Sequence, residues 1–264
     1  MFQLAFQSRP LNPLLDILLG VSAHHLQLLD PTDISVASAA SIYFDRGLRT
    51  CSAMLSQIDE SSCLLFASSI LIALQSVLSR QELARGERYV VPMALFRALR
   101  GVSVIASVGR PYIMDSKFRA LLLDAPQVPV DVVQHDATFT KLWGALAGIA
   151  ELRSVAAYGS AVKYLHWIYV SSQTGEETHS LRKKLLAFPS RVSTLFLSLL
   201  ETSDPIALVI TAHFFGLIPL VDEVWWLQGM AKREILGLLT VVPEDWMWAM
   251  EWPVKQVQCL HILT

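Results

Sequence analysis

Apolar positions recur every three or four residues along most of the chain, and this spacing places them on one face of an α-helix. The first such segment is marked by Leu11, Leu14, Leu15, Leu18, Leu26 and Leu29, and Pro31 ends it. The same pattern predicts further helices over residues 34–58, 62–79, 92–106, 111–123, 135–152, 154–170, 176–188, 189–201, 205–218, 224–239 and 245–260. Proline begins several of them, where its missing N–H costs no hydrogen bond.

Strand signals are weak by comparison. The nearest candidate is residues 128–133, and Pro126 and Pro129 argue against it. The stretch 124–131 is expected to be the least ordered. About a dozen helices joined by short links, without a repeat of fixed period, predict an all-α fold with a single irregular multi-helix domain over residues 1–264.

Composition requires a large buried surface. Of the 264 residues, 53% are hydrophobic and 17% are charged, so the chain needs a large interior, a partner surface or a membrane. Two apolar stretches, 63–78 and 205–221, are short for a membrane span of about 20 residues and contain Gln75, His213 and Pro219. We therefore expect core helices and no membrane span. The N-terminus shows no secretory signal, which favours the nucleus or the cytoplasm.

Charge and cysteine spacing argue against two further classes. The net charge is −2, and the longest basic run, residues 182–184, is typical of a solvated helix face, so direct nucleic acid binding is not expected. Cys51, Cys63 and Cys259 lie far apart, which favours reduced thiols. Without a CxxC pair or an HExxH motif, no metal site and no cofactor are predicted.

Few residues are candidates for a catalytic role. The chain contains no GxSxG elbow and no phosphate-binding glycine loop. His213 lies in an otherwise apolar helix, and Asp222 precedes a tryptophan pair, so these two residues are the candidates for proton transfer if the protein is an enzyme. The alternative is a core histidine and an acidic residue at a helix N-terminus.

Tryptophan is concentrated near the C-terminus, where five of the seven fall within residues 225–252. Large rigid rings suit a pocket for a flat apolar ligand, although simple core packing explains the same residues. Trp252 before Pro253 indicates a bend or a new start in the last helix. The predicted ligand-binding residues are Phe214, Phe215, Trp225, Trp226, Met230, Trp246 and Trp252, and Trp248 belongs to the same aromatic set.

Four blocks of sequence resemble the fungal-specific regulatory domain that follows zinc-cluster DNA-binding domains, the family that includes the sterol uptake control protein. They are NPLLDILLGVSAHHLQL (12–28), ESSCLLFASSILIALQSV (60–77), LFRALRGVSVI (95–105) and the series ALVITAHFFGLI, DEVWWLQGMAKREI and DWMWAMEWPVKQV (207–257). The positions that match the family's WWL-x-G and W-P-V motifs are Trp225, Trp226, Leu227, Gly229, Trp252 and Pro253.

The resemblance implies an all-α regulatory domain that acts in transcription and, in some relatives, binds a sterol in a hydrophobic pocket near the C-terminal helices. The family's DNA-binding module uses six cysteines around two zinc ions. This sequence has three cysteines and begins almost at the regulatory domain, so we expect it to lack that module.

Three functions remain open at this point. The leading one is a regulatory domain that binds an apolar effector such as a sterol. The alternative is an enzyme, a cyclase or isomerase of a hydrophobic secondary metabolite, built on the same helical pocket. The third is an interaction module that forms a homodimer or a heterodimer with related regulators.

Overall fold

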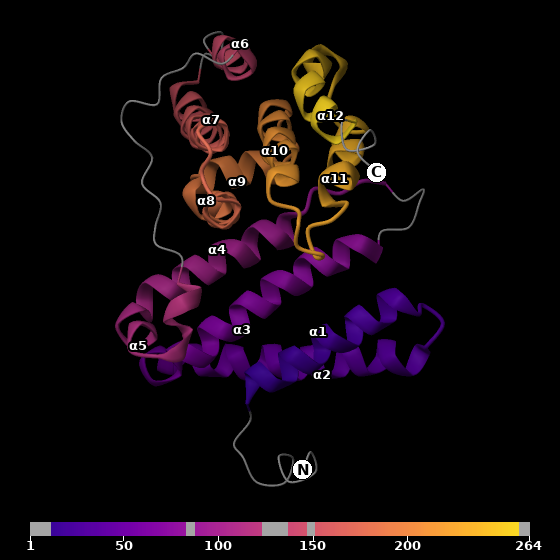
Figure 1. Cartoon of the computed structure of the whole chain (residues 1–264), viewed down its shortest axis with the longest axis vertical. Coiled ribbons are helices and arrows are strands. Elements are labelled where there is room, and N and C mark those ends of the chain that lie inside the picture. Colours follow the sequence, from indigo (N-terminus) through magenta and orange to yellow (C-terminus); the bar gives the residue numbers. More distant parts are fainter. Residues whose placement is uncertain (1–11, 83–87, 123–136, 147–150, 259–264) are drawn as a thin grey trace. The chain divides into compact units, whose positions relative to one another are not determined.

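The computed structural model describes residues 12–82, 88–122, 137–146 and 151–258. Within these ranges the chain forms twelve α-helices and several short 3₁₀ turns, with no strand, so the predicted all-α fold is confirmed. The strand candidate at 128–133 and the segment 124–131 lie outside the described residues. The helices group into two compact units, residues 1–83 with 97–122 and residues 84–96 with 123–264 (Figure 1).

The first unit contains α1 (Pro13–Leu29), α2 (Ile34–Met54), α3 (Ile58–Leu78), most of α4 (Met93–Val108) and α5 (Arg110–Met114). The α1 helix packs along α2 and also against α3. Gly20 allows close approach, because a Cβ atom there would lie 2.8 Å from the Phe44 amide nitrogen. Arg46 of α2 donates to Asp16 of α1, with Nε 2.8 Å from Oδ2, and this ion pair fixes the register of the two helices.

The second unit contains the functional candidates. Its helices are α6 (Ala137–Leu146), α7 (Leu152–Gln173), α8 (Thr178–Arg191), α9 (Thr194–Glu201), α10 (Pro205–Leu217), α11 (Met230–Leu239) and α12 (Glu251–Gln258). Two 3₁₀ segments, Ile218–Leu220 and Glu244–Met250, precede α11 and α12 respectively. The α7, α9, α11 and α12 helices all contact α10 (Figure 1).

The α10 helix is the centre of this unit because it is apolar on every side. All of its residues after Pro205 are buried, as expected for a helix without a polar face. Its start is fixed by Asp204, whose Oδ1 accepts hydrogen bonds from the backbone N–H groups of Ile206 and Ala207, each at 3.0 Å. Tyr158 also donates its hydroxyl to Asp204 at 2.9 Å, so the cap is tied to α7.

Several predicted helix bounds are wrong. The helix predicted over 111–123 is the short α5 followed by the 3₁₀ segment Lys117–Leu121, and the helix predicted over 245–260 starts as the 3₁₀ segment Glu244–Met250. Pro189 does not begin a helix but lies inside α8, and α9 begins at Thr194 because Ser193 accepts a hydrogen bond from Phe196 N–H at 3.1 Å. The helix predicted over 224–239 begins at Met230, because Gly229 has a left-handed backbone with φ of 73°. The tryptophan pair therefore lies in turns before α11.

One helix in the described part of the chain, Ser61–Gln81, is long and apolar enough to cross a membrane, and 56% of its apolar window is buried inside the molecule. The segments Thr194–Glu201 and Pro205–Leu220 meet the same test only as a pair, with a bend of 103° between them. Core helices of this length and composition satisfy the same criterion. The absence of a membrane span stays a prediction.

Candidate functional site

His213 lies near the centre of the second unit with 2% of its surface exposed. Its Nδ1 is 2.9 Å from the carbonyl oxygen of Val209, one helical turn earlier. A carbonyl oxygen only accepts, so Nδ1 carries the proton and donates, and the lone pair of the neutral ring is on Nε2. Burial lowers the pKa of His213 to about 4, and the imidazole is therefore neutral at pH 7.

Trp252, in the first turn of α12, covers the imidazole. The two rings are stacked, with centroids 5.3 Å apart and planes within 7°. Gly216 makes room for the indole, because a Cβ atom at this position would lie 2.7 Å from Cζ3 of Trp252. Phe139 of α6 approaches His213 at 5.8 Å in an edge orientation, which closes another side of the ring. Pro253 follows in the first turn of α12, so the predicted new helix start at this point is confirmed.

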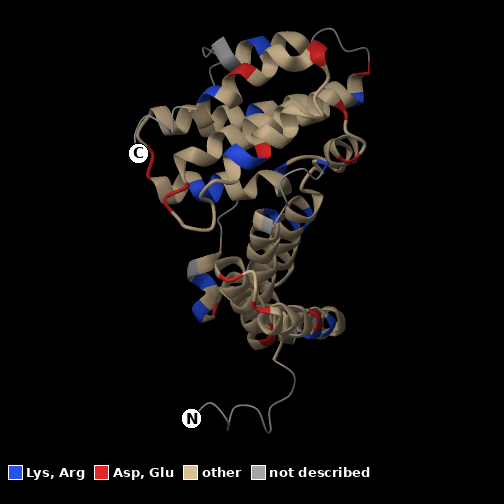
Figure 2. Cartoon of the chain, turned by 90° about the vertical axis from the view of Figure 1, so that its right-hand side faces the viewer, with Lys and Arg blue, Asp and Glu red and all other residues tan. Residues whose placement is uncertain are grey.

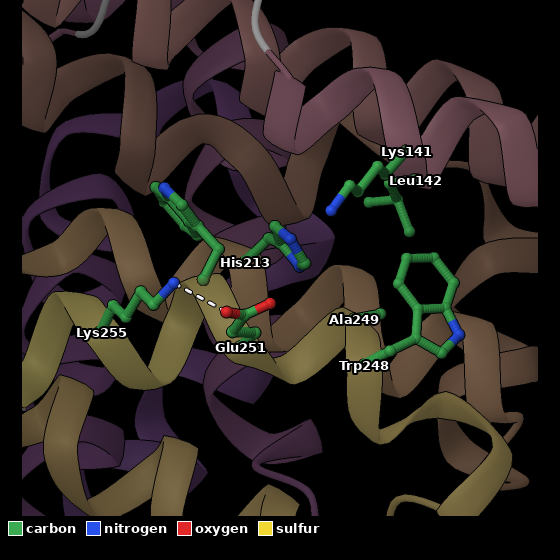
Figure 3. A pocket seen from close by; sticks show the side chains of 8 residues that line it. Lys141, Leu142, His213, Trp248, Ala249, Glu251 and Lys255 are labelled. Carbon is green, nitrogen blue, oxygen red and sulfur yellow. Dashed lines mark hydrogen bonds and ion pairs between the residues drawn. The ribbon is translucent and has the colours of Figure 1, made fainter.

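A pocket of about 220 Å³ opens beside these rings, between α6, α10, the 3₁₀ segment Glu244–Met250 and α12. Figure 3 shows Lys141 of α6 reaching toward the His213 ring, while Glu251 and Lys255 extend from α12. The residues that line it are Lys141, Leu142, His213, Trp248, Ala249, Glu251, Trp252 and Lys255. The lining therefore combines aromatic rings with charged groups.

The charged groups of the pocket are partly paired. Lys255 donates to Glu251 Oε1 at 2.7 Å across one helical turn. The hydrogen bond from Lys255 lowers the pKa of Glu251, with smaller contributions from the charges of Lys255 and Lys141. Glu251 is consequently a carboxylate at neutral pH, and with two ammonium groups beside it the lining carries one net positive charge.

The predicted ligand-binding residues are not all brought together. Trp252 lines the pocket, as do the catalytic candidate His213 and Trp248 of the aromatic set. By contrast, Phe214, Phe215 and Met230 are at most 1% exposed in the core. Phe214, for example, stacks on Phe188 with ring centroids 5.0 Å apart.

The remaining predicted residues do not line this pocket. Trp225 is 49% exposed, Trp226 and Trp246 are half-buried, and Trp246 stacks on Trp248 at 6.0 Å. Asp222 is half-buried, and desolvation raises the pKa of its carboxyl group. Since Asp222 does not line the pocket, it is not placed to exchange a proton with a molecule bound there.

Sequence reasoning missed the charged members of the lining. Glu251 and Lys255 are four residues apart on one helix, and this spacing predicts an ion pair. No local signal links Lys141 to them, because it lies more than a hundred residues earlier in the chain. Among the described residues, no group of three or more His, Cys, Asp or Glu side chains is arranged to hold a metal ion.

Comparison with known proteins supports the predicted resemblance. Over an alignment of 276 positions that covers 96% of this chain, it is 29% identical to a protein of Gibberella zeae named a Zn(2)-C6 fungal-type transcription factor. The chain spans about half the length, 54%, of that curated relative. No family model matches the chain, and no solved structure matches it. The chain is therefore similar, over nearly all of its length, to a protein named as a fungal zinc-cluster transcription factor.

Proposed function

We propose that this chain is the regulatory region of a fungal transcription regulator of the zinc-cluster type, and that it acts in the nucleus. The observation that carries the proposal is the similarity over 96% of the chain to a protein named a Zn(2)-C6 fungal-type transcription factor. The all-α fold agrees with the regulatory domain that the four sequence blocks resemble. We propose that these 264 residues respond to an effector and do not read DNA themselves.

The pocket between α6, α10 and α12 is the proposed effector site. Its volume of about 220 Å³ lies below the range of roughly 300–1,000 Å³ that is usual for drug-sized ligands. A sterol, expected from the family resemblance, would require this pocket to enlarge, and it would bring an apolar body against two lysines and a glutamate. A smaller and more polar effector fits the described lining better.

A transcription assay tests the regulatory role. The full 264-residue chain is fused to an unrelated DNA-binding domain and expressed in a fungal host that carries a reporter gene under that domain's operator. We expect reporter transcription to differ several-fold from that produced by the DNA-binding domain alone at equal protein level. Equal transcription by the two proteins, with the fusion folded and present in the nucleus, would refute the proposed role.

A further inference from the structure

The pocket offers a hydrogen-bond acceptor from a buried side chain. His213 is 2% exposed and lines the pocket, and its Nδ1 is occupied by the carbonyl group of Val209. Among the described residues, the ring's hydrogen bond is the one at Nδ1, so the second nitrogen, Nε2, is available as an acceptor for a molecule in the pocket that His213 lines. Buried polar groups normally have partners, and a bound molecule with an O–H or N–H group would supply one.

The pocket also offers a cation. Lys255 is already paired with Glu251, whereas Lys141 makes no ion pair or hydrogen bond with any described residue. Lys141 extends into the same space as the imidazole and the carboxylate (Figure 3). An ammonium group at the edge of a partly enclosed pocket favours an anionic group on the ligand, because such a pair forms a charge-assisted hydrogen bond.

The size and the rings of the pocket restrict the body of the ligand. A volume of about 220 Å³ suits a molecule smaller than a drug-sized compound. The indole of Trp252 and that of Trp248 contribute flat surfaces to the lining, and Leu142 and Ala249 add apolar ones. Planar aromatic bodies pack favourably on such rings in offset or edge orientations.

From these three features we infer that the pocket binds a small planar aromatic acid, with its carboxylate at Lys141, a hydroxyl or N–H group donated to His213 Nε2, and its ring against the tryptophans. The inference deepens the proposed function, because it names the chemical class of the effector. It rests on that proposal only for the regulatory consequence, since binding can be measured without transcription.

Binding is tested on the purified full chain with 4-hydroxybenzoate as the probe, by isothermal titration calorimetry with tryptophan fluorescence as a second readout. For so small a ligand we expect a Kd on the order of 0.1–1 mM. Methyl 4-hydroxybenzoate lacks the charge and benzoate lacks the donor, so each is expected to bind about tenfold more weakly. Equal affinity for the acid and its methyl ester, or no saturable binding of the acid, would overturn the inference.

Two lysine variants make the test specific for the site. Lys141→Met removes the exposed ammonium group from the pocket. We expect this variant to bind 4-hydroxybenzoate about tenfold more weakly and to bind the methyl ester with unchanged affinity. The matched control is Lys183→Met on α8, which changes the net charge equally but does not line the pocket. Equal losses of affinity in the two variants would show a general charge effect and reject the site.

A third variant addresses the imidazole. His213→Phe keeps an aromatic ring beside Trp252 but removes the acceptor, so the tenfold advantage of 4-hydroxybenzoate over benzoate is expected to disappear. Circular dichroism checks that this variant folds, and the Lys141 result decides the inference if it does not. In the reporter assay, binding without any change of transcription on addition of the acid would keep the site and reject its role as the effector site.

Discussion

The burial of His213 couples the stability of the second unit to pH. Its folded-state pKa of about 4 lies below the ordinary value of 6.5, so the unfolded chain takes up the proton first as the pH falls. The contribution to stability is therefore complete above pH 6.5 and is lost progressively between pH 6.5 and 4. The groups that share its pocket are Lys141, Glu251 and Lys255.

We expect this one residue to remove about 2–3 kcal/mol from the free energy of unfolding when the pH is lowered from 7 to 4.5. Other groups titrate in the same range, so the measurement is urea unfolding of the wild type and of His213→Phe at both pH values. The variant is expected to lose less stability than the wild type by that amount. Parallel losses in the two proteins would contradict the assigned pKa.

A buried carboxylate forms a second polar centre at the residue scale. Glu234 of α11 is fully buried, and Tyr89 donates its hydroxyl to Oε2 at 2.8 Å, while Arg233 Nε lies 3.8 Å from Oε1. Tyr89→Phe removes the hydrogen bond and leaves the acceptor in place, so we expect a loss of about 2 kcal/mol in the free energy of unfolding. Chemical denaturation measures it, with Tyr112→Phe at an exposed position as the control. A loss no larger than in the control would show that the bond contributes little.

At the residue scale, the sequence did not predict the contacts within these polar centres. The pattern of apolar residues predicts which side chains lie inside, and the apolar stretch 205–218 correctly placed His213 in a buried helix. This pattern does not predict which residues that are far apart in the sequence contact each other. Tyr89 and Glu234 are 145 residues apart, and Lys141 joins Glu251 only through the packing of α6 near α12.

At the scale of elements, the contact between α10 and α12 depends on the absence of a side chain at Gly216. Gly216→Ala would place a methyl group 2.7 Å from the Trp252 ring and 3.3 Å from the Pro253 backbone. Alanine is the better helix former, so propensity alone predicts a gain of about 1 kcal/mol. We expect the overpacking to win, with a net loss of about 1–3 kcal/mol in the free energy of unfolding and a displaced indole.

Thermal and urea unfolding of Gly216→Ala measure the sign of this effect. The matched control is Gly144→Ala on α6, where a Cβ atom would have no described atom within 4 Å. There we expect a gain of about 0.5–1 kcal/mol, because only the chain entropy and helix propensity change. A gain of similar size in both variants would mean that α12 moves freely to accommodate the methyl group.

Helix boundaries were predictable where a local group sets them. Pro13, Asp33 and Pro205 mark starts that both the sequence pattern and the structure place within two residues. The failures have tertiary or conformational causes: Pro189 is accommodated in the last turn of α8, and Gly229 takes a left-handed backbone that delays α11. The concentration of tryptophan near the C-terminus left a ligand pocket and simple core packing both open, and the turns before α11 expose Trp225.

At the scale of the whole molecule, composition predicted a large interior, and the continuous apolar sequence of α10 forms its centre in the second unit. Charged residues are spread over both units. Lys and Arg share the helices with Asp and Glu in both units, as Figure 2 shows. In the longest basic run, Arg182 is paired with Glu223 and Lys184 with Glu176, and Lys184 also lies 4.1 Å from the centre of the Trp167 ring.

This distribution leaves few cationic side chains available to bind a phosphate backbone. Two of the three cations in the run already have carboxylate partners, and the net charge of the chain is −2. Affinity for DNA depends on cations that replace condensed counterions. We therefore expect no saturable binding of a labelled duplex up to a protein concentration of about 10 μM at 150 mM salt, measured by fluorescence anisotropy. Submicromolar binding whose affinity falls steeply between 50 and 200 mM salt would contradict this, because it would require several cations to reach the phosphates.

The double variant Glu176→Gln, Glu223→Gln is the control for the role of the ion pairs. If these pairs keep Arg182 and Lys184 from DNA, the double variant is expected to raise the weak affinity for the duplex at 50 mM salt. Lys183→Met removes a cation and is expected to lower that affinity.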